Sequence, residues 1–523
     1  DLALRLDYRI QHLLVDEFQD TSASQIHLLD KLTHGWSDGD GHTLFLVGDP
    51  MQSIYRFRKA EVSLFIMAWQ GRLFEHIHLK PLQLRVNFRS TRPVVEWVNQ
   101  VFPMVMPHQS DPVLGAVSYS AASTKPGVSE SGSVDIQILP GNNHEEEARR
   151  VCEVIGECKN DETIAVLVRS RSHASAILSE LDRLKQALPR YRYQAIKFTP
   201  LADTTLIQDL VSLTLALLQP ADRLAWLATL RAPFNGLNLA DLDTLVAGNA
   251  GNIILDAISA GAGAPDQAQF SADGRQRLQR TAHILLNAVN RRGRQTTRSL
   301  VESAWLSLGG PACIDNDSEL NDAATYFDLL DSLENESLPI DRDTLDLRMK
   351  DLYAEPDADA DGKLQVLTIY SAKGLQFDTV ILPGLNRAPR GDDNKLLHWF
   401  ELAGEDQIVM SPMRNNEEKE KQKKSGDLIK FISTVEKDRK RLEDGRLLYV
   451  ATTRAVHSLH LFAAIKPNAR GEVKANPSSL LAGLWPAIKE AQTPQVLQAV
   501  EDAQASEQED EKQDIRTIVL PQQ

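Results

Sequence analysis

Short apolar runs alternate with amphipathic stretches near the start of the chain. The run at residues 12–17 is followed at 24–33 by apolar residues at helical spacing, and then by a second apolar run at 42–50. Short continuous apolar runs are typical of strands buried in a parallel sheet, whereas a spacing of three to four residues is typical of one helix face. This order predicts a buried strand, a helix and a second buried strand of an α/β sheet.

The strand pattern resumes further along the chain, on both sides of a helical block. A clear strand is predicted at 162–171, helical patterns dominate from about 200 to 345, and further strands are predicted at 364–370, 378–385 and 457–465. A sheet that resumes after a helical block indicates a discontinuous domain with an insertion. We expect the carboxy-terminal part of a first domain at 1–80, a second domain in two parts at 81–200 and 360–466, a mainly helical insertion at 201–359, and a helix with an acidic, disordered tail at 467–523.

Composition narrows the class of protein. Hydrophobic residues make up 42% and charged residues 25% of the 523 residues, which is ordinary for a globular protein, and no apolar run approaches the roughly 18 residues that cross a bilayer. Three cysteines without a completing histidine cluster favour reduced thiols in a cytoplasmic protein. The net charge of −15 argues against nonspecific coating of nucleic acid, but it allows nucleic acid in a local groove.

Two acids follow the first predicted strand directly. Asp16 and Glu17 stand at its carboxyl end, where ligands of parallel sheets bind. A carboxylate at a strand end is a hard oxygen ligand suited to Mg²⁺, and a neighbouring acid can orient a water for attack on a phosphate. The alternative is a strand that ends in solvated acids.

The stretch that follows the second predicted strand combines an amide with alternating aromatic and basic residues. Gln52 is a candidate for contact with a phosphate or a water, and Tyr55 and Phe57 alternate with arginines that include Arg58. Aromatic faces stack unpaired bases and arginines bind phosphates. The alternative is that the two aromatic residues belong to the core at strand spacing.

Further basic residues occur in loops after predicted strands. Arg89 lies in a polar loop, Lys373 in a Lys-Gly turn, and Arg446 and Arg454 lie two helical turns apart and so on one helix face. Arginines that reach a γ-phosphate from a second domain couple hydrolysis to domain closure. Taken singly, each of these residues is equally compatible with a solvated surface position.

Taken together and in order, these segments resemble motifs II to VI of the UvrD/Rep-type superfamily 1 DNA helicases. The segments are "DEFQDT" (16–21), "GDPMQSIYRFRKA" (48–60), "NFRST" (87–91), "TIYSAKGLQFD" (368–378) and "RLLYVATTRA" (446–455). The second segment resembles the RecB/AddA branch, the helicase subunits of exonuclease V type, more closely than it resembles UvrD itself. The resemblance implies two RecA-like parallel-sheet domains, the first incomplete, with ATP between them, single-stranded DNA across them and an α-helical insertion in the second.

The resemblance also implies a role for individual residues. In the nucleotide site, Asp16 would coordinate Mg²⁺, Glu17 would activate water and Gln52 would sense the γ-phosphate. The other nucleotide contacts would be Phe88 to adenine, Arg89 and Arg454 to the γ-phosphate, and Gln376 at the position that contacts the ribose. The residues expected at DNA are Tyr55, Phe57, Arg58, Tyr370 and Lys373.

Several positions depart from the family pattern. The family's P-loop is missing, since no G-x-x-x-x-G-K-[ST] occurs and only 15 residues precede Asp16. We therefore expect an amino-terminal truncation, and little ATP binding or hydrolysis by this chain alone. Gln376 replaces a usual Glu, Tyr370 replaces a usual His, and Gly445 replaces a usual Arg.

Three hypotheses follow from these observations. The leading one is a fragment of an ATP-dependent 3′–5′ single-stranded DNA translocase or helicase of recombination and double-strand-break repair, acting on single-stranded and duplex-end DNA. The alternative is a non-catalytic DNA-binding scaffold subunit of a helicase-nuclease complex. The third is a helicase-nuclease subunit whose nuclease lies elsewhere or on a partner subunit, because no nuclease-like cluster of acids follows the last motif.

Overall fold

The computed structural model describes most of the chain and divides it into two compact units. The described residues are 10–37, 39–141, 143–246, 253–263, 270–314, 316–389, 397–401, 408–412, 426–466 and 473–490. The first unit, here called the sheet unit, combines Asp1–Tyr191 with Val366–Gln523, and the second, the helical unit, is Arg192–Gln365. Of the segment expected to be a helix with an acidic tail at 467–523, residues 467–472 and 491–523 lie outside the described residues, which include the acidic part.

A two-stranded parallel sheet begins the sheet unit. Strands β1 (His12–Val15) and β2 (Thr43–Leu46) pair in parallel and are joined by helix α2 (Ala23–Thr33), as the pattern predicts. One sheet face packs on a cluster that includes Phe18 and helix α3 (Val62–Trp69).

Burial of this small sheet differs from the sequence prediction. Leu14 is 72% exposed and Phe45 is 50% exposed, so the prediction of fully buried strands is wrong for one face. Side chains alternate between the two faces of a strand. Within the described residues, the cluster takes up Val15, Leu44 and Leu46, which lie on the other face.

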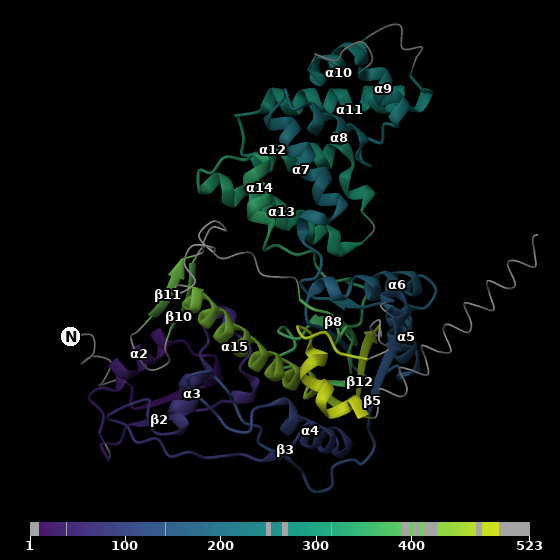
Figure 1. Ribbon diagram of the computed structural model, residues 1–523. Helices are drawn as coiled ribbons and strands as arrows, with labels where there is room; N and C mark the ends of the chain where they lie inside the picture. The colour runs from purple at the N-terminus through teal and green to yellow at the C-terminus, as the bar shows by residue number, and fades with distance from the viewer. Residues whose placement is uncertain are drawn as a thin grey trace, which may run out of the picture. The chain divides into compact units, whose positions relative to one another are not determined.

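A second, six-stranded sheet follows the small sheet described above (Figure 1). Together with the helices packed around it, this sheet confirms the α/β class predicted from the sequence. Strand β12 pairs in parallel with β5 and β9, and β9 pairs in parallel with β6, so segments distant in sequence lie side by side. The strand order is β5 (Ser133–Pro140), β12 (Ala455–Ile465), β9 (Phe377–Leu382), β6 (Ile164–Val168), β8 (Leu364–Thr368) and β7 (Gln194–Ala195).

Helices and short elements complete the sheet unit. All five residues of β6 are buried, which explains the uninterrupted apolar run in its sequence. The helices are α4 (Arg92–Val105), α5 (His144–Glu157), α6 (Ser175–Lys185) and α15 (Gly426–Thr452). The short strands are the parallel pair β3 (Val86–Asn87) and β4 (Ser123–Thr124) and the antiparallel pair β10 (Leu397–Glu401) and β11 (Ile408–Pro412). The 3₁₀ helices are η1 (Phe18–Asp20), η2 (Pro50–Gln52), η3 (Arg56–Arg58), η4 (Arg171–His173) and η5 (Pro189–Tyr191).

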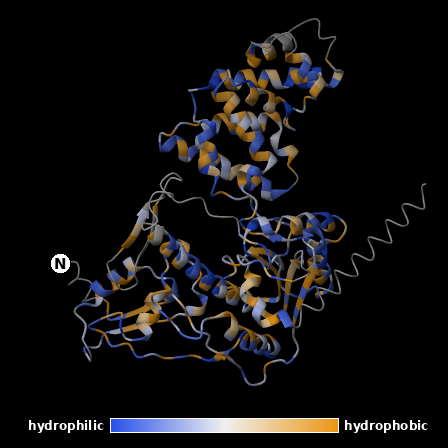
Figure 2. Cartoon of the chain, viewed as in Figure 1, coloured by the Kyte–Doolittle hydropathy of each residue, from blue (hydrophilic) through white to orange (hydrophobic). Residues whose placement is uncertain are grey.

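The helical unit is built around α7 (Thr205–Leu218), which is labelled among the other helices of this unit in Figure 1. Nine of its fourteen residues are buried. Figure 2 shows hydrophobic residues along the helices of this unit. Trp226 and Tyr326 are fully buried in its core, and the Tyr326 hydroxyl shares a 2.8 Å hydrogen bond with that of Thr214. The other helices are η6 (Leu201–Asp203), α8 (Arg223–Arg231), α9 (Leu239–Val246), α10 (Ile254–Gly263), α11 (Ala272–Arg291), α12 (Thr297–Leu308), η7 (Gly310–Cys313), α13 (Asp317–Asn335) and α14 (Arg342–Met349). Across the described part of the chain, no helix combines the length and apolar character needed to span a bilayer.

Candidate functional site

The turn after β1 presents two carboxylates to solvent. Glu17 has a left-handed backbone, with φ of 48°, which is uncommon for a residue other than glycine. Its backbone N–H donates to Asp16 Oδ1 at 2.8 Å, and the Gln19 side-chain amide donates to its carboxylate. This strained turn leaves Asp16 and Glu17 exposed at the carboxyl end of a parallel strand, where the sequence predicts them.

Gln19 links the acidic turn to the segment after β2, and sequence reasoning did not identify it. Its side chain is buried, its Oε1 accepts the Asp49 N–H at 3.0 Å, and its carbonyl accepts from Ser53 Oγ at 3.0 Å. A Cβ at Gly48 would overlap Gln19 Oε1, so a larger residue at this position would displace the Gln19 side chain. The two turns therefore form one connected structure.

Gln52 lies between an acid and an arginine. Its amide donates to Asp49 Oδ2 at 2.8 Å, and its Oε1 accepts from the Arg454 guanidinium at 3.3 Å. Burial raises the pKa of Asp49, and it lowers the pKa of Arg454, which is 1% exposed, to about 10. Arg454 therefore stays charged at neutral pH, and Gln52 connects it to the turn after β2.

Arg89 lies close to Arg454. Arg89 Nε donates to Gln376 Oε1 at 3.2 Å and its guanidinium donates to the Thr453 carbonyl at 3.3 Å. Burial lowers the pKa of Arg454 most, and the charge of Arg89 lowers it further. The hydrogen bonds of both guanidinium groups go to neutral oxygens, including the Leu375 carbonyl, which accepts from Arg454 at 3.1 Å. Two neighbouring cations with neutral acceptors form a local electrostatic site suited to an anion.

Lys373 contacts the acids after β1. Its side chain is 6% exposed, and its Nζ lies 3.1 Å from Glu17 Oε2 and forms an ion pair with Asp20. The ammonium also lies 5.1 Å from the centre of the Tyr55 ring. Burial raises the pKa of Asp20 even though Lys373 lowers it. This lysine, which the resemblance assigns to DNA, thus joins the β8–β9 connection to the acidic turn.

Three aromatic rings and one arginine form a cluster, here called the ring cluster, of Tyr55, Phe57, Tyr370 and Arg58. The Phe57 ring is 5.9 Å from Tyr55 and 5.4 Å from Tyr370, and the Arg58 guanidinium lies within 5.5 Å of the rings of Tyr55 and Phe57. The Tyr55 hydroxyl donates to the Tyr370 carbonyl at 3.0 Å. Phe57 is 64% exposed, so it is not a core residue. The cluster offers an aromatic surface beside cationic groups.

The remaining predicted residues lie at the edges of this arrangement. Phe88 is 73% exposed, and the Lys125 ammonium lies 6.0 Å from its ring. Arg446 is buried and donates to the Ser53 carbonyl at 2.7 Å and to the Gly115 carbonyl at 2.9 Å, which ties α15 to the segment after β2. Glu443, which accepts the Arg56 N–H at 3.3 Å, strengthens the same junction.

Two family models match the chain. The UvrD-like helicase C-terminal domain matches residues 82–465, and the UvrD/REP helicase N-terminal domain matches residues 1–70. These two matches include every site residue described above.

Similar proteins carry related names. The chain is 27% identical over 518 residues to the A subunit of the ATP-dependent helicase/nuclease of Exiguobacterium sibiricum, which covers 89% of this chain and 41% of that protein. It is 25% identical over 507 residues to the protein of the same name from Lactobacillus acidophilus, covering 87% of this chain and 39% of that protein. It is 30% identical over 244 residues to the ATP-dependent DNA helicase srs2 of Schizosaccharomyces pombe, and the match covers 45% of this chain and 24% of that protein. The chain thus spans about two fifths of the length of the helicase/nuclease proteins that it matches.

Proposed function

This chain belongs to the UvrD-like helicase family. We propose that it functions in an ATP-dependent DNA translocase or helicase that moves 3′ to 5′ on single strands. In this proposal, the protein works in recombination and double-strand-break repair. The supporting observation is the connected junction in which Gln52 bridges Asp49 and Arg454 while Arg89 lies beside Arg454. In this proposal, the two arginines bind an anion with several phosphates, and Gln52 links its binding and release to the turn after β2.

We propose that the two arginines contact the γ-phosphate of ATP. Both guanidinium groups donate to neutral oxygens, so a phosphate can exchange for these acceptors with a gain in charge-assisted hydrogen bonds. Gln52 contacts Arg454 directly, so movement of that arginine towards a phosphate would be transmitted to Asp49 and the turn after β2. Arginine contacts of this kind typically contribute a factor of about 10³–10⁵ in turnover.

The acidic turn fits Mg²⁺ held together with a nucleotide. Within the described residues no group of three or more metal-binding side chains gathers. Mg²⁺ at a nucleotide usually takes only one or two carboxylates, with waters and phosphate oxygens as the other ligands. Asp16 is exposed and suited to that role, and Glu17, held in a fixed turn by Gln19, would orient the attacking water.

The ring cluster is the proposed single-stranded DNA surface. Exposed Phe57 supplies a face for base stacking and Arg58 supplies a cation for the backbone. The hydrogen bond from Tyr55 to the Tyr370 carbonyl and the ion pairs of Lys373 connect this surface to the acidic turn. A change in nucleotide state would therefore reach DNA through Lys373 and Tyr55.

A partner protein is also proposed. The names of the relatives describe one subunit of a helicase/nuclease, and we infer a nuclease-bearing assembly that acts at DNA ends. A second candidate is a non-catalytic DNA-binding subunit. This candidate is favoured by the contact of Lys373 with Glu17, because an ammonium at that carboxylate competes with its use in orienting water.

The test compares the variants Arg89→Ala and Arg92→Ala of this protein. Arg92 is a suitable control because it lies three residues away and pairs at the surface with Glu130. Arg89→Ala is expected to lower DNA-stimulated ATP turnover by about 100-fold or more with little change in single-strand affinity, whereas Arg92→Ala retains turnover. Equal turnover by Arg89→Ala and wild type would favour the non-catalytic subunit.

A further inference from the structure

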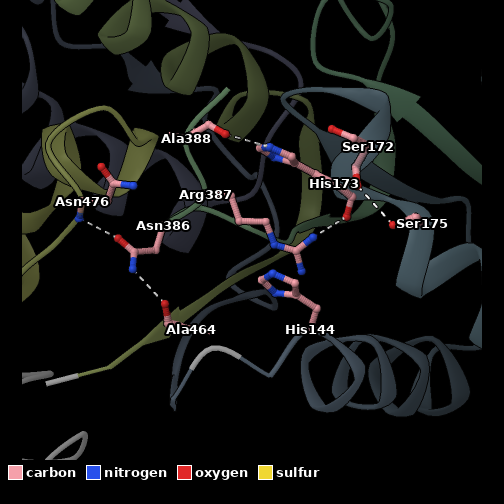
Figure 3. Close-up of a pocket in the computed structure, with 9 residues that line it drawn as sticks. All are labelled: His144, Ser172, His173, Ser175, Asn386, Arg387, Ala388, Ala464 and Asn476. Atoms are coloured by element: carbon pink, nitrogen blue, oxygen red, sulfur yellow. Dashed lines mark hydrogen bonds between the residues drawn. The ribbon is translucent and has the colours of Figure 1, made fainter. Parts of the chain in front are cut away.

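A cavity of about 530 Å³ lies in the sheet unit, away from the residues assigned above (Figure 3). Its lining comes from segments that follow four parallel strands: His144 after β5, His173 after β6, Arg387 after β9 and Ala464 at the end of β12. Because these strands are parallel, their carboxyl ends share one edge of the sheet. Ligands of open α/β sheets bind at this edge, and the volume suits a small molecule.

Helix α6 begins at this cavity without a side-chain cap. Its first residue, Ser175, lines the cavity, and its N-cap residue Ala174 has no side chain that can accept from the first turn. By contrast, Asn143 caps α5 through bonds to two backbone N–H groups. The eleven-residue helix α6 thus directs uncapped N–H groups and the positive end of its dipole towards the cavity.

Arg387 is held rigidly in the cavity wall. Its guanidinium donates to the His173 carbonyl at 2.8 Å and pairs with Glu147, which is fully buried and also accepts the Gly384 N–H at 2.9 Å. Gly384 has φ of +68°, and a Cβ there would lie 3.2 Å from Arg387 Cδ. The Nε of Arg387 is buried and has no hydrogen-bond partner within the described residues. The Nε–H of the arginine therefore remains an unused donor.

Two histidines in the wall also have an unused ring nitrogen. His173 is 6% exposed, and its Nε2 lies 3.3 Å from the Ala388 carbonyl, which assigns the proton of the neutral ring to Nε2. The buried Nδ1 atoms of His173 and His144 have no partner among the residues that the structure describes. Figure 3 shows the Arg387 guanidinium between the two rings. Unpaired buried polar atoms are costly, so their presence on three side chains that line one cavity points to a ligand.

We propose that this cavity binds the phosphate group of a small phosphorylated ligand, either inorganic phosphate or a mononucleotide. The uncapped start of α6 supplies backbone N–H donors, Arg387 supplies a cation in the wall, and the two histidine rings become donors at Nδ1 when they are protonated. The proposal concerns a site distinct from the Arg89 and Arg454 junction and does not depend on the function proposed there.

Charge balance explains how the cavity accepts an anion. Glu147 neutralises Arg387, so the anion's charge must be met by the helix end and by protonation of the histidines. Burial and the charge of Arg387 lower the pKa of His144, and Glu147 raises it. Burial lowers the pKa of His173, and the nearby charges of Arg387, Arg169 and His144 lower it further. An anion between the two rings raises both pKa values, so binding takes up protons.

The test is isothermal titration with inorganic phosphate and with 5′-AMP. Ser175→Asp places a carboxylate at the start of α6, where acids are favourable. This carboxylate would occupy the position proposed for the phosphate and repel an incoming anion. Ser179→Asp is the matched control, because it adds the same charge one turn further along the same helix at an exposed position. Arg387→Lys keeps a cation for Glu147 but removes Nε, which provides a second variant if Ser175→Asp folds poorly.

The expected result is that Ser175→Asp and Arg387→Lys each weaken phosphate binding at least tenfold, while Ser179→Asp changes it less than threefold. Sulfate, which keeps one charge state across the range, should bind more tightly at pH 6 than at pH 8. Retention of binding in both Ser175→Asp and Arg387→Lys would overturn the proposal. Loss of binding in Arg89→Ala alone would place the ligand at the other junction, and displacement of phosphate by unphosphorylated single-stranded DNA would identify a nucleic-acid surface instead. The turnover of Arg89→Ala tests the proposed function separately.

Discussion

Replacement of Lys373 by Met tests whether the acidic turn depends on a cation from the β8–β9 connection. Lys373 contacts Glu17 and Asp20, which lie more than 350 residues earlier in the chain. Met retains most of the aliphatic length of the side chain but removes the ammonium. Among the residues that the structure describes, the largely buried Asp20 carboxylate then has no ion-pair partner.

The magnitude follows from burial. Loss of one partner of a fully buried ion pair typically costs about 3–5 kcal/mol. The exposed fractions of the side chains are 6% for Lys373, 17% for Asp20 and 59% for Glu17. Because water reaches Glu17 and part of Asp20, we expect a cost of about 2 kcal/mol, below that range. This cost corresponds to a roughly 30-fold larger equilibrium constant for local opening, and so to roughly 30-fold faster hydrogen exchange through that opening.

Hydrogen exchange measured by mass spectrometry is the suitable assay. A chain with two compact units has no single unfolding transition, whereas exchange reports local opening in peptides covering residues 12–22 and 368–376. Asp20→Asn removes the charge that Lys373 neutralises, so the Asp20→Asn and Lys373→Met double variant should recover most of the loss. The control is Lys125→Met, which removes an exposed ammonium elsewhere.

The pH dependence has a definite sign. Burial raises the pKa of folded Asp20 above its unfolded value, so its charged form destabilises the fold at pH values above the folded pKa. Removal of Lys373 removes a cation that lowers this pKa. The cost of Lys373→Met should therefore be largest near pH 8 and shrink as the pH falls towards about 4. Equal exchange by wild type and variant at pH 8, or additive single and double changes, would refute the ion-pair explanation.

Three further predictions concern other parts of the molecule. Phe57→Ala should weaken single-strand binding by about 1–3 kcal/mol in fluorescence anisotropy, while Phe57→Tyr retains it; unchanged affinity of the Ala variant would exclude stacking. Tyr326→Phe should lower the free energy of local opening of the helical unit by about 1 kcal/mol in hydrogen exchange, because Thr214 keeps its bond to the Leu210 carbonyl and so is not left without a partner; a much larger loss would contradict this. Gly310→Ala should also speed exchange in this unit, since a Cβ would overlap the Trp305 indole, and unchanged exchange would show that the indole moves freely.

Local pattern was a sound guide to the elements of the fold. The sequence predicts a clear strand at 162–171, and the structure forms β6 there with all five of its residues buried. The predicted burial was wrong for β1, where Leu14 is exposed. Apolar sequence reports the tendency to bury a residue, whereas actual burial depends on which neighbouring layers are present.

In the candidate site, too, local sequence patterns predicted some residues, whereas others depend on contacts between distant segments. Asp16 and Glu17 could be predicted because a strand followed by acids is a local signal. Gln19 could not, because its importance arises from burial and from a bond to Asp49, thirty residues later. Pairing between Lys373 and Asp20 was equally invisible, since the same lysine is compatible with a solvated or DNA-binding position.

By itself, the sequence determined the periodicities of strands and helices, the order of the motifs and the chemical types of the site residues. These properties depend on residues that are neighbours in the chain. Only the tertiary structure decided that Gln52 contacts Arg454, that Lys373 pairs with Asp20, and that four strand ends line a cavity whose arginine and histidines have unpaired nitrogens. The physical reason is that such contacts join segments up to several hundred residues apart, and packing of the whole sheet unit selects them from many alternatives of similar local energy.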